Sequence, residues 1–256
     1  MEKVFHYFYI VNLCAIVPPV IYLFVLLIKL PLAIRRFKQA GLKILIWFYV
    51  MTWIIVLLLI LQALFDRILV VELVTNSMIY FSQFMVLTYM MFGILKPKKA
   101  LFSTLITSAI FTSVITITQL SFMELNEGFF FNSKNQDTVQ HVFWSTFNGS
   151  FAIIYAILIF LPHFKKFEKW LPAKDLFYAF LFLLFVKNAL FSFGHFSILD
   201  SSSVGYCYID ISVIIFNTFY IPFWYFTFLH GFMMSDAIPV YYHKLLISEF
   251  GNEELF

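Results

Sequence analysis

Residues 176–197 read LFYAFLFLLFVKNALFSFGHFS, and this stretch decides the class of the fold. It is long enough to cross the hydrocarbon core of a bilayer, which takes about 20 apolar residues. Its one formally charged residue, Lys187, lies roughly 15 Å along the helix, at a rise of about 1.5 Å per residue. A charge at that depth costs about 2.5–3.5 kcal/mol on insertion scales, so Lys187 must be paired or useful.

The composition of the whole chain indicates an integral membrane protein. Of its 256 residues, 62% are hydrophobic and only 12% are charged. A soluble domain carries about 25% charged residues, so this chain has too little polar surface to stay folded in water. The net charge of +3 is small and predicts no nucleic-acid partner.

Seven segments are long and apolar enough to span a membrane, which predicts an all-α bundle of seven transmembrane helices. We expect them within a single domain, residues 1–235, followed by a short cytoplasmic tail, residues 236–256. Pro18, Pro19 and Pro222 lie inside spans and should bend them. The expected spans are 9–34, 44–65, 73–95, 100–122, 142–162, 176–197 and 207–230.

Basic residues in the short loops predict the orientation, because cytoplasmic loops carry an excess of lysine and arginine. The second, fourth and sixth loops hold only Arg67 and Lys134. We therefore expect the N-terminus outside and the C-terminus in the cytoplasm, with the longest outer loop at about 123–141. The first, third and fifth loops hold Arg35, Arg36, Lys38, Lys43, Lys96, Lys98, Lys99, Lys165, Lys166, Lys169 and Lys174.

No motif of a metal site or an enzyme is present in the sequence. No two of the six histidines lie three or four residues apart, as ligands on one helix turn would. His195 with Asp200 is the nearest approach to a constellation, and an ordinary interfacial histidine explains His195 as well. We expect no catalytic residues, no metal and no cofactor. Cys14 and Cys207 are expected to be free thiols, with a bond between them as the alternative.

Several polar residues lie within the expected spans. Glu72 opens the third span, Asp210 lies near the start of the seventh, and Gln83 and Asn217 add hydrogen-bonding groups. Ionisable groups inside a membrane usually face the bundle interior and pair with one another. We therefore expect Lys187 to point inward and to interact with Asp210 or Glu72.

That interaction has more than one interpretation. It is either a structural pair that fixes helix packing or the polar floor of a ligand pocket among the outer halves of the third, sixth and seventh helices. A Schiff-base lysine is a third interpretation, which no other feature supports. The residues expected to line the pocket are Glu72, Gln83, Lys187, Asn188 and Asp210.

The seventh span contains Asn217, Pro222 and Tyr225, a proline kink followed by a tyrosine one turn later. A kink of this kind is a two-state element, so these residues are candidates for a conformational switch.

Two further patterns are expected to be structural. Asn148-Gly-Ser150 matches a glycosylation sequon but starts inside a span, so we interpret it as chance. Small hydroxylic residues of the fourth span suit close helix packing and weak interhelical hydrogen bonds. They are Ser103, Thr104, Thr107, Ser108, Thr112, Ser113 and Thr116.

Several stretches between residues 16 and 236 together resemble the transmembrane protein adipocyte-associated 1 family of orphan seven-span, receptor-like proteins. The matching features are Val17–Pro31, Phe143 and Trp144, Tyr155–Pro162, Asn188 six before Gly194, Cys207-x-x-Asp210, Pro222-x-x-Tyr225, Phe228–Phe232, and Glu72 with Gly93 by spacing.

The chain also departs from the family pattern. Ser82 and Gln83 stand where the family carries a second acid, and Lys187 stands where it often has an apolar residue. The family's longer C-terminal tail is largely absent. The resemblance implies a G-protein-coupled-receptor-like fold, with no catalytic residues or ligand to carry over.

We therefore expect an orphan receptor-like, multi-pass protein of the plasma membrane or an endomembrane. Its expected partners are membrane lipids and, at the cytoplasmic loops, a heterotrimeric G protein. Three alternatives stay open. A transporter of ions or small solutes would use Lys187, Asp210 and Glu72 as a relay. An accessory protein would assist folding or trafficking of another membrane protein, and a lipid-active hydrolase is the last alternative.

Overall fold

The computed structural model describes residues 2–40, 43–65, 69–95, 100–125, 133–163, 175–200, 202–230 and 233, and all regular structure in these ranges is helical. The elements are α1 (Glu2–Ala40), α2 (Lys43–Leu64), α3 (Leu69–Leu95), α4 (Ala100–Leu125), α5 (Ser133–Phe160), the 3₁₀ turn η2 (Leu161–His163), α7 (Asp175–Leu199), α8 (Val204–Trp224) and the π-helix η3 (Tyr225–His230).

Within the described ranges, seven helices are long and apolar enough to cross a membrane, which confirms the predicted all-α, seven-span class. Large apolar side chains cover their outer faces, for example Ile28, Phe102 and Val70 at 76%, 70% and 65% exposure. Apolar exposure on this scale is expected of lipid-facing helices and not of a soluble surface. The candidate segments are Ile16–Lys38, Leu45–Leu64, Val70–Thr88, Leu101–Ser121, Thr138–Phe160, Leu176–Leu199 and Val204–His230.

The expected loop at 123–141 is wrong in its extent. The fourth helix continues to Leu125, and the fifth begins at Ser133, nine residues before the predicted start at residue 142. Polar residues outside the hydrocarbon can continue a helix, because the backbone satisfies its own hydrogen bonds there as well as in lipid. His141, which we had expected in the loop, therefore lies on α5.

The chain divides into two compact units, and each is described by itself. The first contains Met1–Pro18 and Ile117–Phe223, and the second contains Pro19–Thr116 and Trp224–Phe256. Two of the three helices that pass from one unit to the other do so at a proline: α1 between Pro18 and Pro19, and α8 two residues after Pro222. These are the prolines that were expected to bend their spans.

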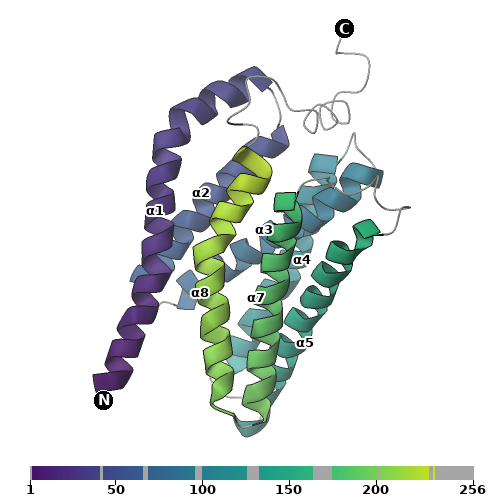
Figure 1. Ribbon diagram of the computed structural model, residues 1–256. Coiled ribbons are helices and arrows are strands. Elements are labelled where there is room, and N and C mark those ends of the chain that lie inside the picture. The colour runs from purple at the N-terminus through teal and green to yellow at the C-terminus, as the bar shows by residue number, and fades with distance from the viewer. Residues whose placement is uncertain are drawn as a thin grey trace. The chain divides into compact units, whose positions relative to one another are not determined.

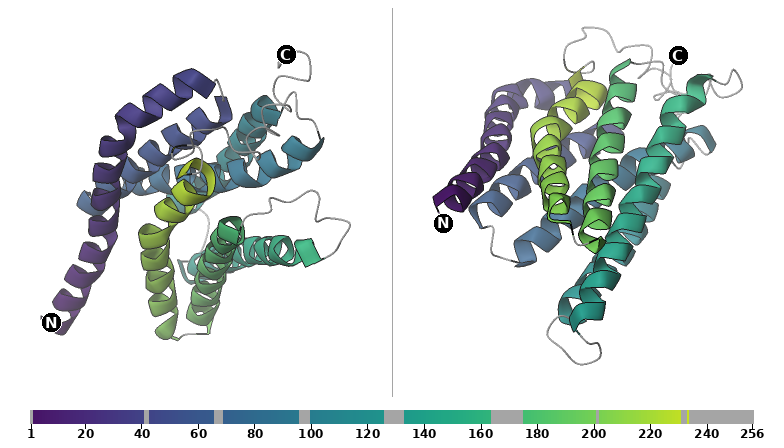
Figure 2. Two further views of the ribbon diagram at one scale, coloured as in Figure 1. Left: turned by 45° about the horizontal axis from the view of Figure 1, so that its top comes forward. Right: turned by 60° about the horizontal axis from the view of Figure 1, so that its bottom comes forward.

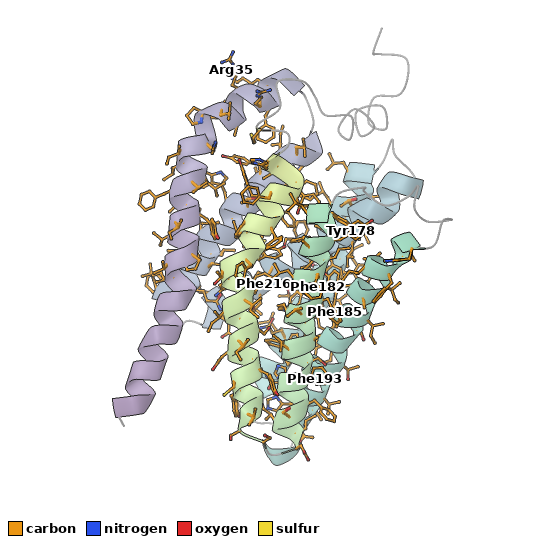
Figure 3. All side chains as sticks on the ribbon, viewed as in Figure 1. Arg35, Tyr178, Phe182, Phe185, Phe193 and Phe216 are labelled. Atoms are coloured by element: carbon orange, nitrogen blue, oxygen red, sulfur yellow. The ribbon has the colours of Figure 1, made fainter. Side chains whose placement is uncertain are left out.

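In the first unit, α5, α7 and the larger part of α8 lie side by side (Figure 1), and they remain adjacent in both views of Figure 2. Helices α5 and α7 are antiparallel and pack along much of their length. Phe182 and Phe193, labelled on α7 in Figure 3, are 57% and 63% exposed and mark its outer face.

In the second unit, α2 packs against α3 and against η3. The ring of Phe48 on α2 stacks on Phe228 at 4.8 Å between centroids and meets Trp224 edge-on at 5.3 Å. The Trp224 indole Nε1 donates to the backbone oxygen of Phe48 at 3.3 Å. This aromatic cluster therefore fastens the end of α8 and η3 to α2.

Candidate functional site

The interface between α5 and α7 carries polar side chains from both helices at three levels, which we call the polar ladder, and hydrogen bonds join the two helices at the first two levels. At the first level, the Nδ1 atoms of His141 and His195 lie 2.8 Å apart. One ring must donate and the other accept, so both cannot be in the charged form, in which each ring nitrogen is a donor. His195 is 8% exposed, and its other ring nitrogen, Nε2, is buried with no hydrogen-bond partner among the described residues.

The second level joins Ser145 and Ser192. The Ser192 hydroxyl donates to the backbone oxygen of Ser145 at 2.8 Å, and the Ser145 hydroxyl donates to the backbone oxygen of Ser192 at 3.1 Å. Such reciprocal bonds require the two backbones to approach closely. Gly149, one turn beyond Ser145, permits this approach, because a Cβ there would lie 3.1 Å from the Ser192 hydroxyl oxygen.

The third level consists of Asn148 and Asn188, both fully buried. Each amide donates from Nδ2 to a carbonyl one turn back on its own helix, at 2.8 Å to Trp144 and 2.7 Å to Leu184. Neither Oδ1 accepts a hydrogen bond from any described residue. A buried acceptor without a donor costs about 1–3 kcal/mol.

The spacing of these residues explains why they meet. Residues three, four and seven apart share one face of a helix. The ladder residues are His141, Ser145 and Asn148 on α5, and His195, Ser192 and Asn188 on the antiparallel α7. The order histidine, serine, asparagine runs forward along α5 and backward along α7, over about 10 Å of each helix.

Lys187 lies on α7 beside the third level and is 8% exposed, as the prediction of an inward-facing lysine required. Its ammonium nitrogen lies 5.1 Å from the ring centre of Phe191 and 5.8 Å from that of Phe216, within cation–π range. Phe216, labelled in Figure 3, belongs to α8. The Ser212 hydroxyl, also on α8, donates to the backbone oxygen of Lys187 at 3.0 Å. Lys187 thus contacts α8 through its side chain and its backbone.

Two glycines set the distance between α7 and α8 near their connection. A Cβ on Gly194 would lie 2.9 Å from the backbone oxygen of Gly205, and a Cβ on Gly205 would lie 2.5 Å from that of Gly194. Neither position has room for a side chain. The close approach keeps Ser212 and Phe216 within reach of Lys187.

The other residues predicted for the pocket lie in different surroundings. Asp210 is half-buried on α8 in the first unit, and its pairing with Lys187 stays a prediction. Glu72 is exposed in the first turn of α3, and Gln83 is fully buried on the same helix. Both belong to the second unit, so their part in a pocket with Lys187 also stays a prediction.

The candidate switch residues follow one another along α8. Asn217 is 9% exposed, and Pro222 lies inside the helix. Three residues later, at Tyr225, the hydrogen-bonding pattern changes from α to π and stays so to His230. π-helical turns are rare and occur frequently at functional sites.

The histidine pair is the site feature that sequence reasoning missed. His141 and His195 are 54 residues apart, so a pattern of histidines on one helix turn does not include them. Asp200, the partner considered for His195, is exposed. The available signal was the matching set of spacings on two neighbouring spans. Among the described residues, no three of His, Cys, Asp or Glu form a group that could hold a metal ion. Cys207 is a free, exposed thiol, and Cys14 lies outside the residues whose side chains are described.

Comparison with known proteins places the chain in a family. Residues 4–245 match a family model described as "Predicted membrane protein". A transmembrane protein adipocyte-associated 1 homolog from Caenorhabditis elegans is 25% identical over 233 residues, which cover 84% of this chain and 51% of the relative. The chain belongs to the transmembrane protein adipocyte-associated 1 family. It is a multi-pass membrane protein.

A second member of the adipocyte-associated 1 family, the homolog from Caenorhabditis briggsae, is 33% identical over 90 residues, 34% of this chain and 20% of the relative. The chain thus spans about half the length of the C. elegans relative and less of the second. No solved structure matches the chain. Of the family features noted in the sequence, the Asn188–Gly194 spacing has a physical reason here. Asn188 belongs to the third ladder level, and Gly194 makes the close backbone contact with Gly205 on α8.

Proposed function

We propose that this chain is a receptor-like signalling protein of the membrane and not an enzyme. The observation that supports this proposal is that a single helix, α8, connects the buried polar residues with the candidate switch. Ser212 and Phe216 contact Lys187, and the π-helical turn begins at Tyr225. From Ser212 to Tyr225 is about 20 Å of helix at 1.5 Å per residue.

The π-helical turn supplies a two-state element for such a connection. Converting a π turn to α geometry changes the residue spacing by one position, which rotates the following residues by about 100°. Trp224 and Phe228 would then leave their present contacts with Phe48 on α2. A ligand that displaces Lys187 or α8 can therefore alter the surface near the end of α8.

The orientation proposed with this function places the N-terminus outside and the end of α8 at the cytoplasmic side. The basic loops then face the cytoplasm, where Arg35, exposed near the end of α1 (Figure 3), would lie. A heterotrimeric G protein is the proposed partner at this side. The 11 basic loop residues are expected in the cytoplasmic loops of any multi-pass membrane protein, so they do not by themselves support coupling to a G protein.

The test is nucleotide-sensitive co-purification. The tagged chain is isolated from native membranes after apyrase treatment and probed for Gα with and without a non-hydrolysable GTP analogue. We expect Gα to be retained without nucleotide and released by the analogue. Pro222→Ala should weaken the retention, whereas Pro31→Ala, on an exposed position of α1, should not.

Two results would contradict receptor coupling. One is the absence of Gα from the eluate, and the other is a Gα signal that the analogue does not change. A stoichiometric membrane partner in place of Gα would favour the accessory alternative.

A transporter is the second candidate, and the division into two units favours it. The chain passes from one unit to the other beside prolines in α1 and α8, and alternating access moves one half of a transporter against the other. Flux of protons or small ions in proteoliposomes that is lost in Lys187→Met would support this candidate over the receptor.

A further inference from the structure

The third level of the polar ladder has two hydrogen-bond acceptors and no donor for either. Asn148 and Asn188 are 0% exposed, and both Oδ1 atoms lack a partner among the described residues. The orientation of each amide is fixed, because Nδ2 must face the carbonyl one turn back on its own helix. The other two levels are closed by direct bonds between the helices, so the third differs from them.

The two asparagines lie at one level of the interface. Ser145 on α5 bonds to Ser192 on α7. Asn148 lies three residues after Ser145, and Asn188 lies four residues before Ser192. Both asparagines share a face with the serine of their own helix, since three and four residues are close to one turn. The two acceptor oxygens therefore belong to the same level of the α5–α7 interface.

The chemistry of these atoms limits what can bind there. An oxygen acceptor is satisfied by an N–H or O–H donor, and two acceptors call for a group with two donors. A fully ionised carboxylate or phosphate has no N–H or O–H to donate to these two oxygens, although the nearby Lys187 would attract it. A cation would be repelled by Lys187, the residue next to Asn188. The bound group is therefore neutral.

The surroundings of the level are apolar. One turn before each asparagine lie Trp144, 8% exposed, and Leu184, fully buried, and Phe151 and Ala152 follow on α5 at 5% and 6% exposure. A ligand that reaches the asparagines must therefore carry its donor group on an apolar body, as a membrane-dissolved amphiphile does.

We propose that Asn148 and Asn188 form an intramembrane binding site for a neutral amphiphile whose head group carries two hydrogen-bond donors, such as a monoacylglycerol. This inference rests on the proposed receptor function, since it names the ligand class of the site that contains Asn188. Ligand binding itself requires no G protein, so the two proposals can fail separately.

The test compares four lipids with one oleoyl chain and different head groups, added to the purified protein in lipid nanodiscs. 1-Oleoylglycerol is neutral and has two donors, methyl oleate is neutral and has none, oleate is an anion and oleylamine is a cation. We expect 1-oleoylglycerol at near-saturating amounts to raise Tm by about 5 °C. The other three should raise it by less than about 1 °C.

Two substitutions connect that shift to the site. Asn148→Leu and Asn188→Leu should each remove the Tm shift caused by 1-oleoylglycerol, because each deletes one acceptor. Gln119→Leu is the matched control, since Gln119 is also a buried amide of the first unit with an unpartnered Oε1, at 7% exposure. The control should keep the full shift. Alanine variants of the two asparagines replace the leucine variants if the latter do not fold.

The proposal is overturned if 1-oleoylglycerol gives no shift, if methyl oleate gives an equal one, or if the asparagine variants retain it. Gα coupling without any lipid shift would leave the receptor function standing and remove this site. A Tm shift caused by 1-oleoylglycerol without Gα coupling would support this site and contradict the receptor function.

Discussion

Two helix pairs of this protein are joined by small polar side chains, yet they use them differently. Between α3 and α4, in the second unit, the Thr88 and Ser108 hydroxyls lie 2.9 Å apart, and those of Ser77 and Thr116 lie 2.7 Å apart. Thr88 and Ser77 also reach carbonyls one turn back on their own helix. Between α5 and α7, two levels are closed in the same way and the third is open.

The difference separates packing from function. Hydroxyl pairs hold transmembrane helices together at about 0.6 kcal/mol each on average. An open pair of buried amides does the opposite, because unsatisfied acceptors destabilise the fold. A feature that lowers stability needs a reason other than packing. We therefore propose a functional role for the open level between α5 and α7. Helix α4 also has two buried hydroxyl oxygens without a hydrogen-bond partner among the described residues, on Thr104 and Thr112, but these are not paired across a helix interface.

The largest expected effect concerns Lys187, the charged neighbour of the open level. If Lys187 pairs with the half-buried Asp210, Lys187→Leu should lower the free energy of unfolding by about 3 kcal/mol, because it leaves that acid without its cation. Adding Asp210→Asn should restore most of this loss. The measurement is unfolding by dodecyl sulfate titration in lipid–detergent micelles.

Lys187→Leu with Glu72→Gln serves as the comparison for that double variant, since Glu72 was the other acid considered. If neither double variant is more stable than Lys187→Leu alone, Lys187 is not half of an ion pair.

The next effect concerns the other face of α7. Gly205→Ala places a Cβ 2.5 Å from the Gly194 backbone oxygen, so α7 and α8 must move apart. We expect a loss of about 2 kcal/mol. Gly149→Ala contacts only the Ser192 side chain, whose hydroxyl oxygen would lie 3.1 Å from the new Cβ, and should cost less than about 1 kcal/mol. If both variants lose the same stability in this titration, the contact between α7 and α8 at Gly205 is no closer than the contact between α5 and α7 at Gly149.

Removing a hydrogen-bonded hydroxyl pair should lower stability by a smaller amount, and by about the same amount in the α5–α7 and α3–α4 interfaces. Ser145→Ala with Ser192→Ala, and Thr88→Val with Ser108→Ala, should each lower stability by about 1 kcal/mol, because each removes hydrogen bonds between two helices. Ser150→Ala is the control, since its exposed hydroxyl bonds only within α5, to the Thr146 backbone oxygen. A loss at one interface alone would show that the closed levels are not equivalent.

The sequence predicts the fold class well because the bilayer imposes simple rules. A span needs a fixed length of apolar residues, and its backbone must be helical. Seven such segments were found, and the structure has seven helices of that kind within its described residues. Bending at Pro18, Pro19 and Pro222 stays a prediction, although two unit boundaries fall beside these prolines.

The site is less predictable, because its residues meet through the packing of separate helices. The depth of Lys187 marked it as an interior group from sequence alone. The partners of Asn188 and His195 depend on the register of α5 against α7, which no local pattern specifies. The sequon at Asn148 is interpreted as chance, and the residue is fully buried, but its level with Asn188 was not predicted. The hydroxyl residues of the fourth span were expected to make interhelical bonds, and Ser108 and Thr116 do.

The measurement that tests the central claim most directly compares the open level with a closed pair by dodecyl sulfate titration without added ligand. Asn148→Leu with Asn188→Leu should raise the free energy of unfolding by about 1 kcal/mol, because it removes two unsatisfied acceptors. Thr88→Val with Ser108→Ala should lower it by a similar amount. Opposite signs would support a functional role for the open level. A loss of stability in both double variants would mean that the asparagines serve packing, as the hydroxyls do, and would contradict the account.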